Sequence, residues 1–287
     1  MIEPISLGTW PTPVEPAPRL RERLGLGKLW FKRDDLSGLG GGGNKVRKLE
    51  YTCAQAIAAG AGTVITSGGP QSNHARLTAA AAARLGLRCV LVLAGTEREP
   101  TGNLVLDELA GAEKVWAGDR PLADVVEESR GDAFVIPFGG SSATSIEGYA
   151  TCGRELKAQL GDFDTVVTAL GSGGTMAGLV KELGPERVVG VDTGAVPDPA
   201  ATVAGLLGGA VAPGDLRIDR NQVGAGYAAL TDAVRDALAL TARTEGVFLD
   251  PTYTGRAMAS LIAGGHGDRV VFLHSGGLPG LFGHHEV

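Results

Sequence analysis

One lysine in the chain follows a run of four glycines after one intervening residue. The segment GLGGGGNKVRKLEY spans residues 38–51 and places Lys45 where a glycine-rich loop gives way to a helical pattern. Glycines let a backbone and a ligand approach closely. A phosphate-binding P-loop needs Ser or Thr after its lysine, and Val46 stands there instead. The alternative interpretation of Lys45 is a solvated lysine in a flexible turn. Lys48, one helical turn further along, is a second candidate for a lysine that contacts a ligand.

Two further segments have the pattern of anion sites at helix N-termini. SGGPQSNHAR (67–76) follows the apolar run TVIT, and Ser72 or Asn73 is expected to cap the helix after it. GSGGT (171–175) likewise lies between an apolar run and a helical segment. Amides at a helix N-terminus bind carboxylates and phosphates. A dinucleotide fingerprint would need glycine where the chain has Met176, so a monophosphate fits the second segment better.

Two glycine-containing segments near the end of the chain are less specific. In DPTYTGRAM (250–258), Tyr253 and Thr254 open a predicted helix. In HSGGLPG (274–280), Ser275 follows the apolar run RVVFLH. Taken singly, each of these residues is as consistent with capping as with a functional role.

The elements expected to position these segments alternate along the chain. Apolar, β-branched runs predict strands at 63–66, 89–94, 134–138, 165–170, 187–192 and 269–274. Helical spacing of apolar residues predicts helices over 72–85, 144–160, 174–183 and 228–243. Apolar strands separated by helices are typical of parallel sheets covered on both faces, which bind ligands at the carboxyl ends of the strands.

Composition restricts the class of protein. The chain has 287 residues and a net charge of −6, which argues against nucleic acid as the main partner. Its three cysteines form no CxxC pair, and its histidines have no recognised metal-binding spacing. No secretory pattern opens the chain, and no apolar run is long enough to span a membrane. We therefore expect a cytoplasmic α/β protein without a metal site.

In this order, the segments resemble the pyridoxal 5′-phosphate (PLP)-dependent D-cysteine desulfhydrase and 1-aminocyclopropane-1-carboxylate (ACC) deaminase family. WFKRDDLSGLGGGGNKVRKLEY, SGGPQSNHAR, GSGGT, GYAAL, DPTYTGRAM and HSGGLPG carry the resemblance, which spans Trp10 to Gly283. It implies the two-domain α/β architecture of PLP fold type II, each domain a mostly parallel twisted sheet covered by helices. We expect a large PLP-binding domain of residues 1–46 plus 147–287, a small domain of residues 47–146, and a homodimer. The connections around 110–130 and 195–220 are shorter than is usual in the family.

The resemblance also implies roles for individual residues. Lys45 matches the Schiff-base lysine, and Asn73 matches the residue that binds the cofactor's phenolic oxygen. Ser72, with neighbouring amides, matches the substrate-carboxylate site. The other implied contacts are Gly171, Ser172, Gly173, Gly174 and Thr175 to the cofactor phosphate, Tyr227, Tyr253 and His74 to the substrate, and Thr254 and Ser275 near the pyridine nitrogen.

The pair Thr254 and Ser275 separates the two branches of the family. The deaminases carry glutamate and leucine at these places, and the desulfhydrases carry hydroxyl residues. A hydroxyl only hydrogen-bonds a neutral pyridine nitrogen, which suffices when a thiolate leaves from Cβ. We therefore expect β-elimination from D-cysteine to give pyruvate, hydrogen sulfide and ammonia. The alternatives are ACC deamination, elimination from L-cysteate or another β-substituted alanine, and a non-catalytic PLP- or nucleotide-binding protein.

Overall fold

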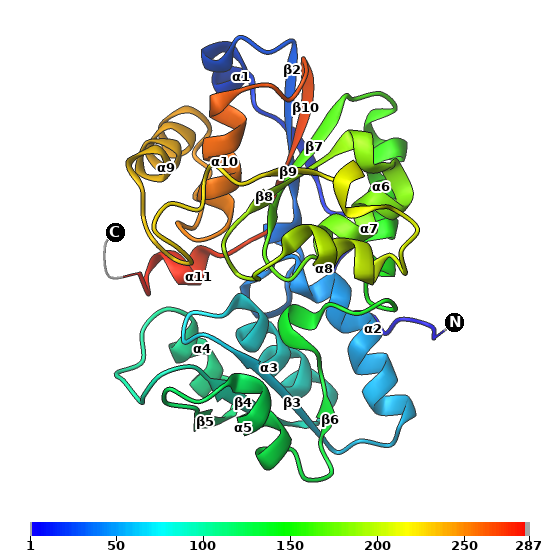
Figure 1. Cartoon of the computed structure of the whole chain (residues 1–287), viewed down its shortest axis with the longest axis vertical. Coiled ribbons are helices and arrows are strands. Elements are labelled where there is room, and N and C mark those ends of the chain that lie inside the picture. The colour runs from blue at the N-terminus through cyan, green and yellow to red at the C-terminus, as the bar shows by residue number, and fades with distance from the viewer. Residues whose placement is uncertain (1, 285–287) are drawn as a thin grey trace.

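The strands of the protein form two separate sheets. The computed structural model describes residues 2–284, and Figure 1 shows one sheet in its upper half and one in its lower half. The six-stranded sheet has the order β1-β2-β10-β7-β8-β9, and the four-stranded sheet has the order β5-β4-β3-β6. Apart from the antiparallel pair β1 and β2, neighbouring strands run parallel. The expected α/β fold with mostly parallel sheets is confirmed.

The six-stranded sheet takes strands from both ends of the chain. They are β1 (Val14–Pro16), β2 (Lys28–Arg33), β7 (Thr165–Leu170), β8 (Val188–Asp192), β9 (Arg217–Asp219) and β10 (Arg269–His274). Apolar side chains of one face pack with α1 (Pro18–Leu24), α9 (Asp232–Glu245) and α10 (Thr254–Ala263). Those of the other face pack with α6 (Glu147–Leu160), α7 (Gly174–Leu183) and α8 (Pro199–Leu206). Every residue of β7 is buried, as expected of a strand covered on both faces.

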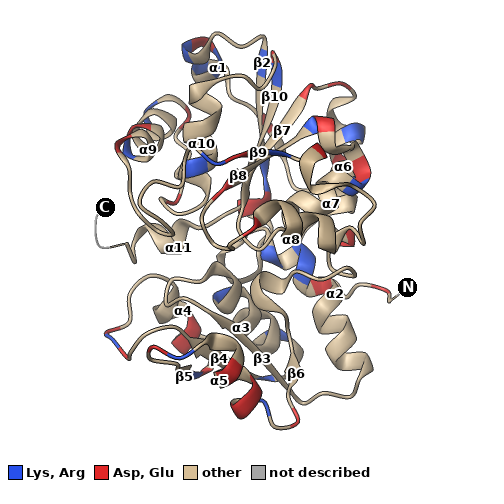
Figure 2. Ribbon diagram, viewed as in Figure 1, with Lys and Arg blue, Asp and Glu red and all other residues tan. Residues whose placement is uncertain are grey.

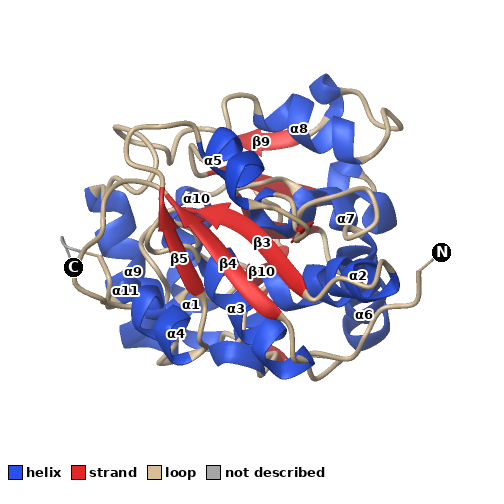
Figure 3. Cartoon of the chain, turned by 90° about the horizontal axis from the view of Figure 1, so that it is seen from below, coloured by secondary structure: helices blue, strands red, loops and turns tan. Residues whose placement is uncertain are grey.

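The four-stranded sheet is built from the middle of the chain. Its strands are β3 (Thr63–Gly68), β4 (Arg88–Leu93), β5 (Glu113–Trp116) and β6 (Phe134–Val135). One face packs with α2 (Lys45–Ala58), α3 (Asn73–Leu85) and α4 (Asn103–Leu109), and the other with α5 (Leu122–Ser129). Figure 3 shows β3, β4 and β5 between these helices.

The predicted elements form, with shifts at their ends. The expected strand 134–138 stops at Val135, because Pro137 has no N–H for a ladder and a 3-10 turn follows at Phe138–Gly140. The helix expected over 228–243 begins at Asp232, after the Thr231 side chain caps it. Four short strands, β1, β2, β5 and β9, were not predicted. The short helix α11 (Leu278–Leu281) follows β10 and is the last element of the described chain.

A buried polar network fixes the beginning of α2. Arg47 donates from Nε to Asp34 Oδ2 at 2.8 Å and also binds both carboxylate oxygens of Glu155 on α6. Tyr149 and Thr12 donate to the Asp34 carboxylate as well. Figure 2 shows Lys and Arg residues at the start of α2, at the junction of the two halves. The network thus anchors the helix turn that carries Lys45.

No helix within residues 2–284 is long and apolar enough to cross a membrane. The predicted domain limits at residues 46 and 147 remain a prediction. The strands of the four-stranded sheet fall within residues 63–135, and α2 runs across the first limit.

Candidate active site

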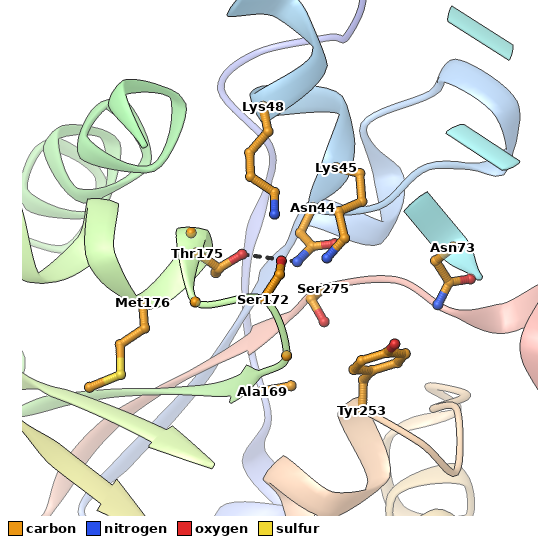
Figure 4. A pocket seen from close by; sticks show the side chains of 13 residues that line it. Asn44, Lys45, Lys48, Asn73, Ala169, Ser172, Thr175, Met176, Tyr253 and Ser275 are labelled. Carbon is orange, nitrogen blue, oxygen red and sulfur yellow. Dashed lines mark hydrogen bonds between the residues drawn. The ribbon is translucent and has the colours of Figure 1, made fainter. Parts of the chain in front are cut away.

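A polar pocket lies where the carboxyl ends of β7 and β10 meet the N-terminus of α2. Figure 4 shows the side chains that line it. This inner pocket is lined by Asn44, Lys45, Lys48, Asn73, Ala169, Gly171, Ser172, Gly173, Gly174, Thr175, Met176, Tyr253 and Ser275. All five segments singled out in the sequence contribute to it, and the structure therefore brings together residues from distant parts of the chain.

Lys45 is the first residue of α2 and points into this pocket (Figure 4). Burial lowers the pKa of its amine to about 8, against the opposing effects of a hydrogen bond with Lys48 and the charge of Asp250. A lysine with such a pKa is partly neutral near physiological pH. It can therefore act as a nucleophile or as a base.

Lys48 lies one helical turn further along α2 and is fully buried. Its amine donates to the carbonyl of Gly139 and to Ser141 Oγ, the latter at 3.1 Å. Burial and then the charge of Lys45 hold its pKa well below the ordinary lysine value. An anion bound in the pocket would stabilise the charged forms of both amines, because it would offset the repulsion between them.

The loop Gly171–Thr175 closes one side of the pocket and leads into α7. Ser141 Oγ accepts a hydrogen bond from Gly174 N at 3.2 Å and lies 2.8 Å from Ser172 Oγ. A Cβ added at Gly174 would lie 2.5 Å from Ser141 Oγ, so a side chain there would displace the Ser141 hydroxyl. The loop thus combines amides at a helix N-terminus with hydroxyls and a nearby lysine, which is the donor set that suits a phosphate. We therefore call residues 171–175 the phosphate-type loop.

Asn44 and Asn73 both present side-chain amide groups to the pocket. Asn44 Nδ2 donates to Thr175 Oγ1 at 2.9 Å, the bond drawn in Figure 4. Asn73 is the first residue of α3, and its side-chain nitrogen is turned toward the pocket in the same view. Asn44 therefore ties the start of α2 to the phosphate-type loop, whereas Asn73 offers an N–H donor to a ligand.

A second, larger cavity opens outward from the first. This outer cavity has a volume of about 280 Å³ and shares Lys45, Ser172 and Tyr253 with the inner pocket. The remaining lining residues are Gly69, Ser72, His74, Ala94, Leu122, Phe138, Gly139, Gly194, Ala195 and Tyr227. Its position, with Lys45 at the shared wall, suits a small substrate beside a cofactor in the inner pocket.

Ser72 has two possible uses in this cavity. Its Oγ accepts a hydrogen bond from Ala75 N at 3.1 Å, so it caps α3 as its sequence position indicated. The hydroxyl proton is not used by that bond and can be donated to an anion. The N-terminus of α3 lies at the same place, which favours a carboxylate.

His74 is buried and neutral. Thr66 Oγ1 donates its proton to the carbonyl of Ile136 and therefore accepts from His74 Nε2 at 2.9 Å. Burial, and then the charges of Lys48 and Lys45, keep the pKa of His74 well below its ordinary value. Its Nδ1 is consequently an acceptor, and it makes no hydrogen bond to a described residue.

The two tyrosines meet over the outer cavity. The hydroxyls of Tyr227 and Tyr253 are 2.5 Å apart, and their rings pack edge to face. Burial, and then the neighbouring Tyr227, raise the pKa of Tyr253 well above its usual value, so it stays protonated. The pair therefore supplies a phenolic proton donor beside Lys45.

Ser275 and Thr254, which the family resemblance places together near the pyridine nitrogen, lie in different surroundings. Ser275 lines the inner pocket at the end of β10. Thr254 is fully buried, lines neither cavity, and donates its hydroxyl to Asp250 Oδ1 at 2.6 Å. Asp250 also accepts three backbone N–H bonds, from Thr252, Tyr253 and Thr254, in the turn that leads into α10.

Sequence reasoning missed the turn at 138–141. Gly139 and Ser141 hold Lys48 and the phosphate-type loop together. The glycine pair in FGGSS, directly after a predicted strand, was the available signal.

Comparison with known proteins agrees with this geometry. Residues 5–276 match the family described as pyridoxal-phosphate dependent enzyme. A putative 1-aminocyclopropane-1-carboxylate deaminase of Pyrococcus abyssi (strain GE5 / Orsay) is 39% identical over 98% of this chain and 94% of the relative. A D-cysteine desulfhydrase of Salmonella choleraesuis (strain SC-B67) is 39% identical over 96% of this chain and 94% of the relative.

Solved structures extend the agreement to three dimensions. A structure described as an ACC deaminase homologue superposes with a TM-score of 0.88 at 35% identity, covering 99% of this chain and 94% of that one. A threonine deaminase has a TM-score of 0.71 at 23% identity, covering 93% of this chain and 92% of that one, and shares the fold. The protein is thus a PLP-dependent enzyme of fold type II. The chain belongs to the D-cysteine desulfhydrase and ACC deaminase family, as the sequence motifs indicated.

The residues of the inner pocket fit this cofactor. Lys45 would supply the amine for its aldehyde, the loop Gly171–Thr175 with Lys48 would supply donors for its phosphate, and Asn73 and Ser275 would supply groups for its ring. A side chain at Gly174 would displace the Ser141 hydroxyl that bonds this loop.

Proposed function

We propose that the enzyme catalyses β-elimination from a small amino acid, foremost D-cysteine. With water, D-cysteine gives pyruvate, hydrogen sulfide and ammonia. The observation that carries this choice is the composition of the inner pocket: Ser275 lines it, and no Asp or Glu is among its 13 lining residues.

The electronic properties of the cofactor's pyridine ring explain why such a pocket favours β-elimination. Pyridoxal phosphate supplies an electron sink for the charge left at Cα when a proton is lost. A carboxylate beside the pyridine nitrogen would keep that nitrogen protonated and the sink strong. A serine hydroxyl supports only a neutral nitrogen, so turnover should depend on a Cβ substituent that leaves easily.

The residues around the substrate have separate tasks in this proposal. Ser72 and the amides at the start of α3 hold the substrate carboxylate. Lys45 holds the cofactor covalently and, once released, takes the Cα proton at Nζ. Its pKa of about 8 leaves a useful neutral fraction near neutral pH. Tyr253, kept protonated by burial, is placed to donate a proton toward the leaving sulfur.

The competing activity is ACC deamination, favoured by the names of one relative and one solved structure. It requires opening an unactivated ring, for which a strong electron sink is needed. Pyruvate release from a panel of D- and L-amino acids, with 2-oxobutyrate release from ACC, distinguishes the two. Release from ACC alone would overturn the proposal.

We further propose that the enzyme is a cytoplasmic homodimer with domains divided at residues 46 and 147. Three buried cysteines without disulfides, Cys53, Cys89 and Cys152, support a reducing compartment. Phe248, Leu278 and Phe282 are exposed large apolar side chains that a second copy would cover. Sedimentation analysis of the purified holoenzyme tests the dimer, and a purely monomeric species would refute it.

A further inference from the structure

Asn103 is a buried residue that the proposed mechanism does not use. It is the first residue of α4 and is completely inaccessible to solvent. Its side-chain nitrogen donates two hydrogen bonds, to the carbonyl of Gln71 at 2.9 Å and to Asn73 Oδ1 at 3.1 Å. A primary amide has two N–H donors. Both are used here, which fixes the orientation of this side chain.

The amide of Asn73 is oriented by donors alone. Besides Asn103 Nδ2, the guanidinium of Arg76 approaches Asn73 Oδ1 at 3.5 Å. The same Arg76 is buried and donates to the carbonyls of Gly40 and Gly42. A flipped Asn73 would place its NH₂ group against these N–H donors. The oxygen therefore faces Asn103, and the nitrogen faces the inner pocket, as Figure 4 shows.

We propose that Asn103 is a positioning residue that keeps the N–H groups of Asn73, rather than its oxygen, turned toward the cofactor's phenolic oxygen. This inference rests on the proposed cofactor site and deepens it. An N–H donor favours the ionised phenolate, because hydrogen bonding to a charged form stabilises that form. A carbonyl oxygen at the same place would favour the protonated phenol.

A purely structural role for Asn103 has its own signature. Gln71 joins the same two loops, since its Oε1 accepts from Asn103 N and its Nε2 donates to the carbonyl of Thr101, both at 2.9 Å. These bonds tether the turn before α3 to α4 without touching Asn73. Gln71→Ala is therefore the matched control, because it loosens the tether and leaves the Asn103–Asn73 bond in place.

The test compares absorbance spectra of purified holoproteins, in which ionised and protonated phenol absorb at different wavelengths. Asn103→Asp presents only acceptors, so Asn73 should turn its NH₂ toward residue 103 and its oxygen toward the cofactor. The ratio of protonated to ionised phenol should rise at least about threefold. Asn103→Ala should shift it less, and Gln71→Ala should leave it unchanged. If Asn103→Asp does not fold, Asn103→Ala alone carries the comparison.

A double-mutant cycle shows whether Asn103 acts through Asn73. In an Asn73→Ala background, Asn103→Ala should add no spectral change. Three results overturn the inference: wild-type spectra for both Asn103 variants, an equal shift in Gln71→Ala, or an undiminished Asn103 effect without Asn73. If wild-type protein shows no borohydride-sensitive absorbance, the proposed cofactor site is wrong and the inference falls with it.

Discussion

Lys45 and Lys48 lie one helical turn apart on α2, and both line the inner pocket without forming an ion pair to any described carboxylate. Lys45 also lines the outer cavity, whereas Lys48 does not, and its amine is held by hydrogen bonds to Gly139 and Ser141. One lysine is therefore exposed to the substrate side, and the other is turned to the phosphate-type loop.

This division of work predicts different outcomes for two lysine variants. Lys45→Ala should abolish the borohydride-sensitive absorbance and all turnover. Lys48→Ala should keep the covalent link but weaken cofactor affinity about tenfold or more, because it removes a charged hydrogen-bond donor. The exposed Lys157→Ala serves as a control. Peptide mapping that found the reduced adduct on Lys48 would contradict the assignment.

The pKa of Lys45 predicts how apoprotein recaptures PLP. Only the neutral amine attacks the aldehyde, and a pKa lowered from 10.5 to about 8 gives that form at lower pH. The rate of link formation should rise with pH and level off above a pH of about 8. Stopped-flow absorbance measures it, and a rate that still climbed steeply a full unit or more above that pKa would show an ordinary lysine.

Ser72→Ala should raise KM or lower kcat for amino acids and leave PLP content near normal. It also removes the α3 cap, which costs about 0.5–2 kcal/mol of stability. Thr231→Ala removes an equivalent cap from α9, away from the pocket. That control should lose stability without a change in KM. Loss of PLP from Ser72→Ala would instead assign Ser72 to the cofactor or to the fold.

Asp107 on α4 predicts a pH dependence of stability. Its carboxylate is fully buried, makes no hydrogen bond to a described residue, and has a pKa raised by burial to about 7. The folded protein therefore binds this proton more tightly than the unfolded chain does, and stability is lost as pH rises from about 4 to about 7. Asp107→Asn should be more stable at mildly alkaline pH, by at most about 4 kcal/mol.

Urea unfolding at about pH 5 and about pH 8, on either side of the raised pKa, measures this effect. Asp107→Asn should flatten the difference between the two. A variant less stable than wild type at the higher pH would mean that the charge attraction to Arg76 outweighs burial.

Replacing Thr254 by Glu and Ser275 by Leu should shift activity toward ring opening at the expense of thiol elimination. The structure makes Thr254 the harder position, because its hydroxyl bonds Asp250 and its surroundings are closed. The two changes need not add, because only Ser275 lines the inner pocket and a glutamate at position 254 would have to reach it from a buried position. Relative kcat/KM for ACC and D-cysteine is the measurement, and an unchanged ratio in a folded, PLP-loaded double variant would refute the role.

The sequence was sufficient to predict the elements that carry strong local signals. The strand β7, all of whose residues are buried, and the glycine-rich loop before Lys45 were recognised from composition and spacing. The strands β1, β2, β5 and β9 were not, because three to six residues of mixed polarity acquire their conformation from neighbouring strands rather than from their own pattern.

The site was predictable as a set of residues and less so as a set of contacts. Ser275 and Asn73 line the pocket where the motifs suggested. The contact of Asn103 with Asn73 joins residues 30 positions apart and depends on how separate chain segments pack. The contact of Thr254 with Asp250 spans only four positions, but the motif alone did not indicate that the Thr254 hydroxyl bonds Asp250 and does not line the pocket.

The pocket around Ser275 is the feature that we propose makes this enzyme an eliminase. Wild-type turnover of D-cysteine and of ACC under identical conditions decides the matter, with keto-acid release as the common readout. We expect rapid pyruvate formation from D-cysteine and almost no 2-oxobutyrate from ACC. Comparable or faster turnover of ACC would show that the serine and the absence of a carboxylate among the described lining residues do not set the reaction.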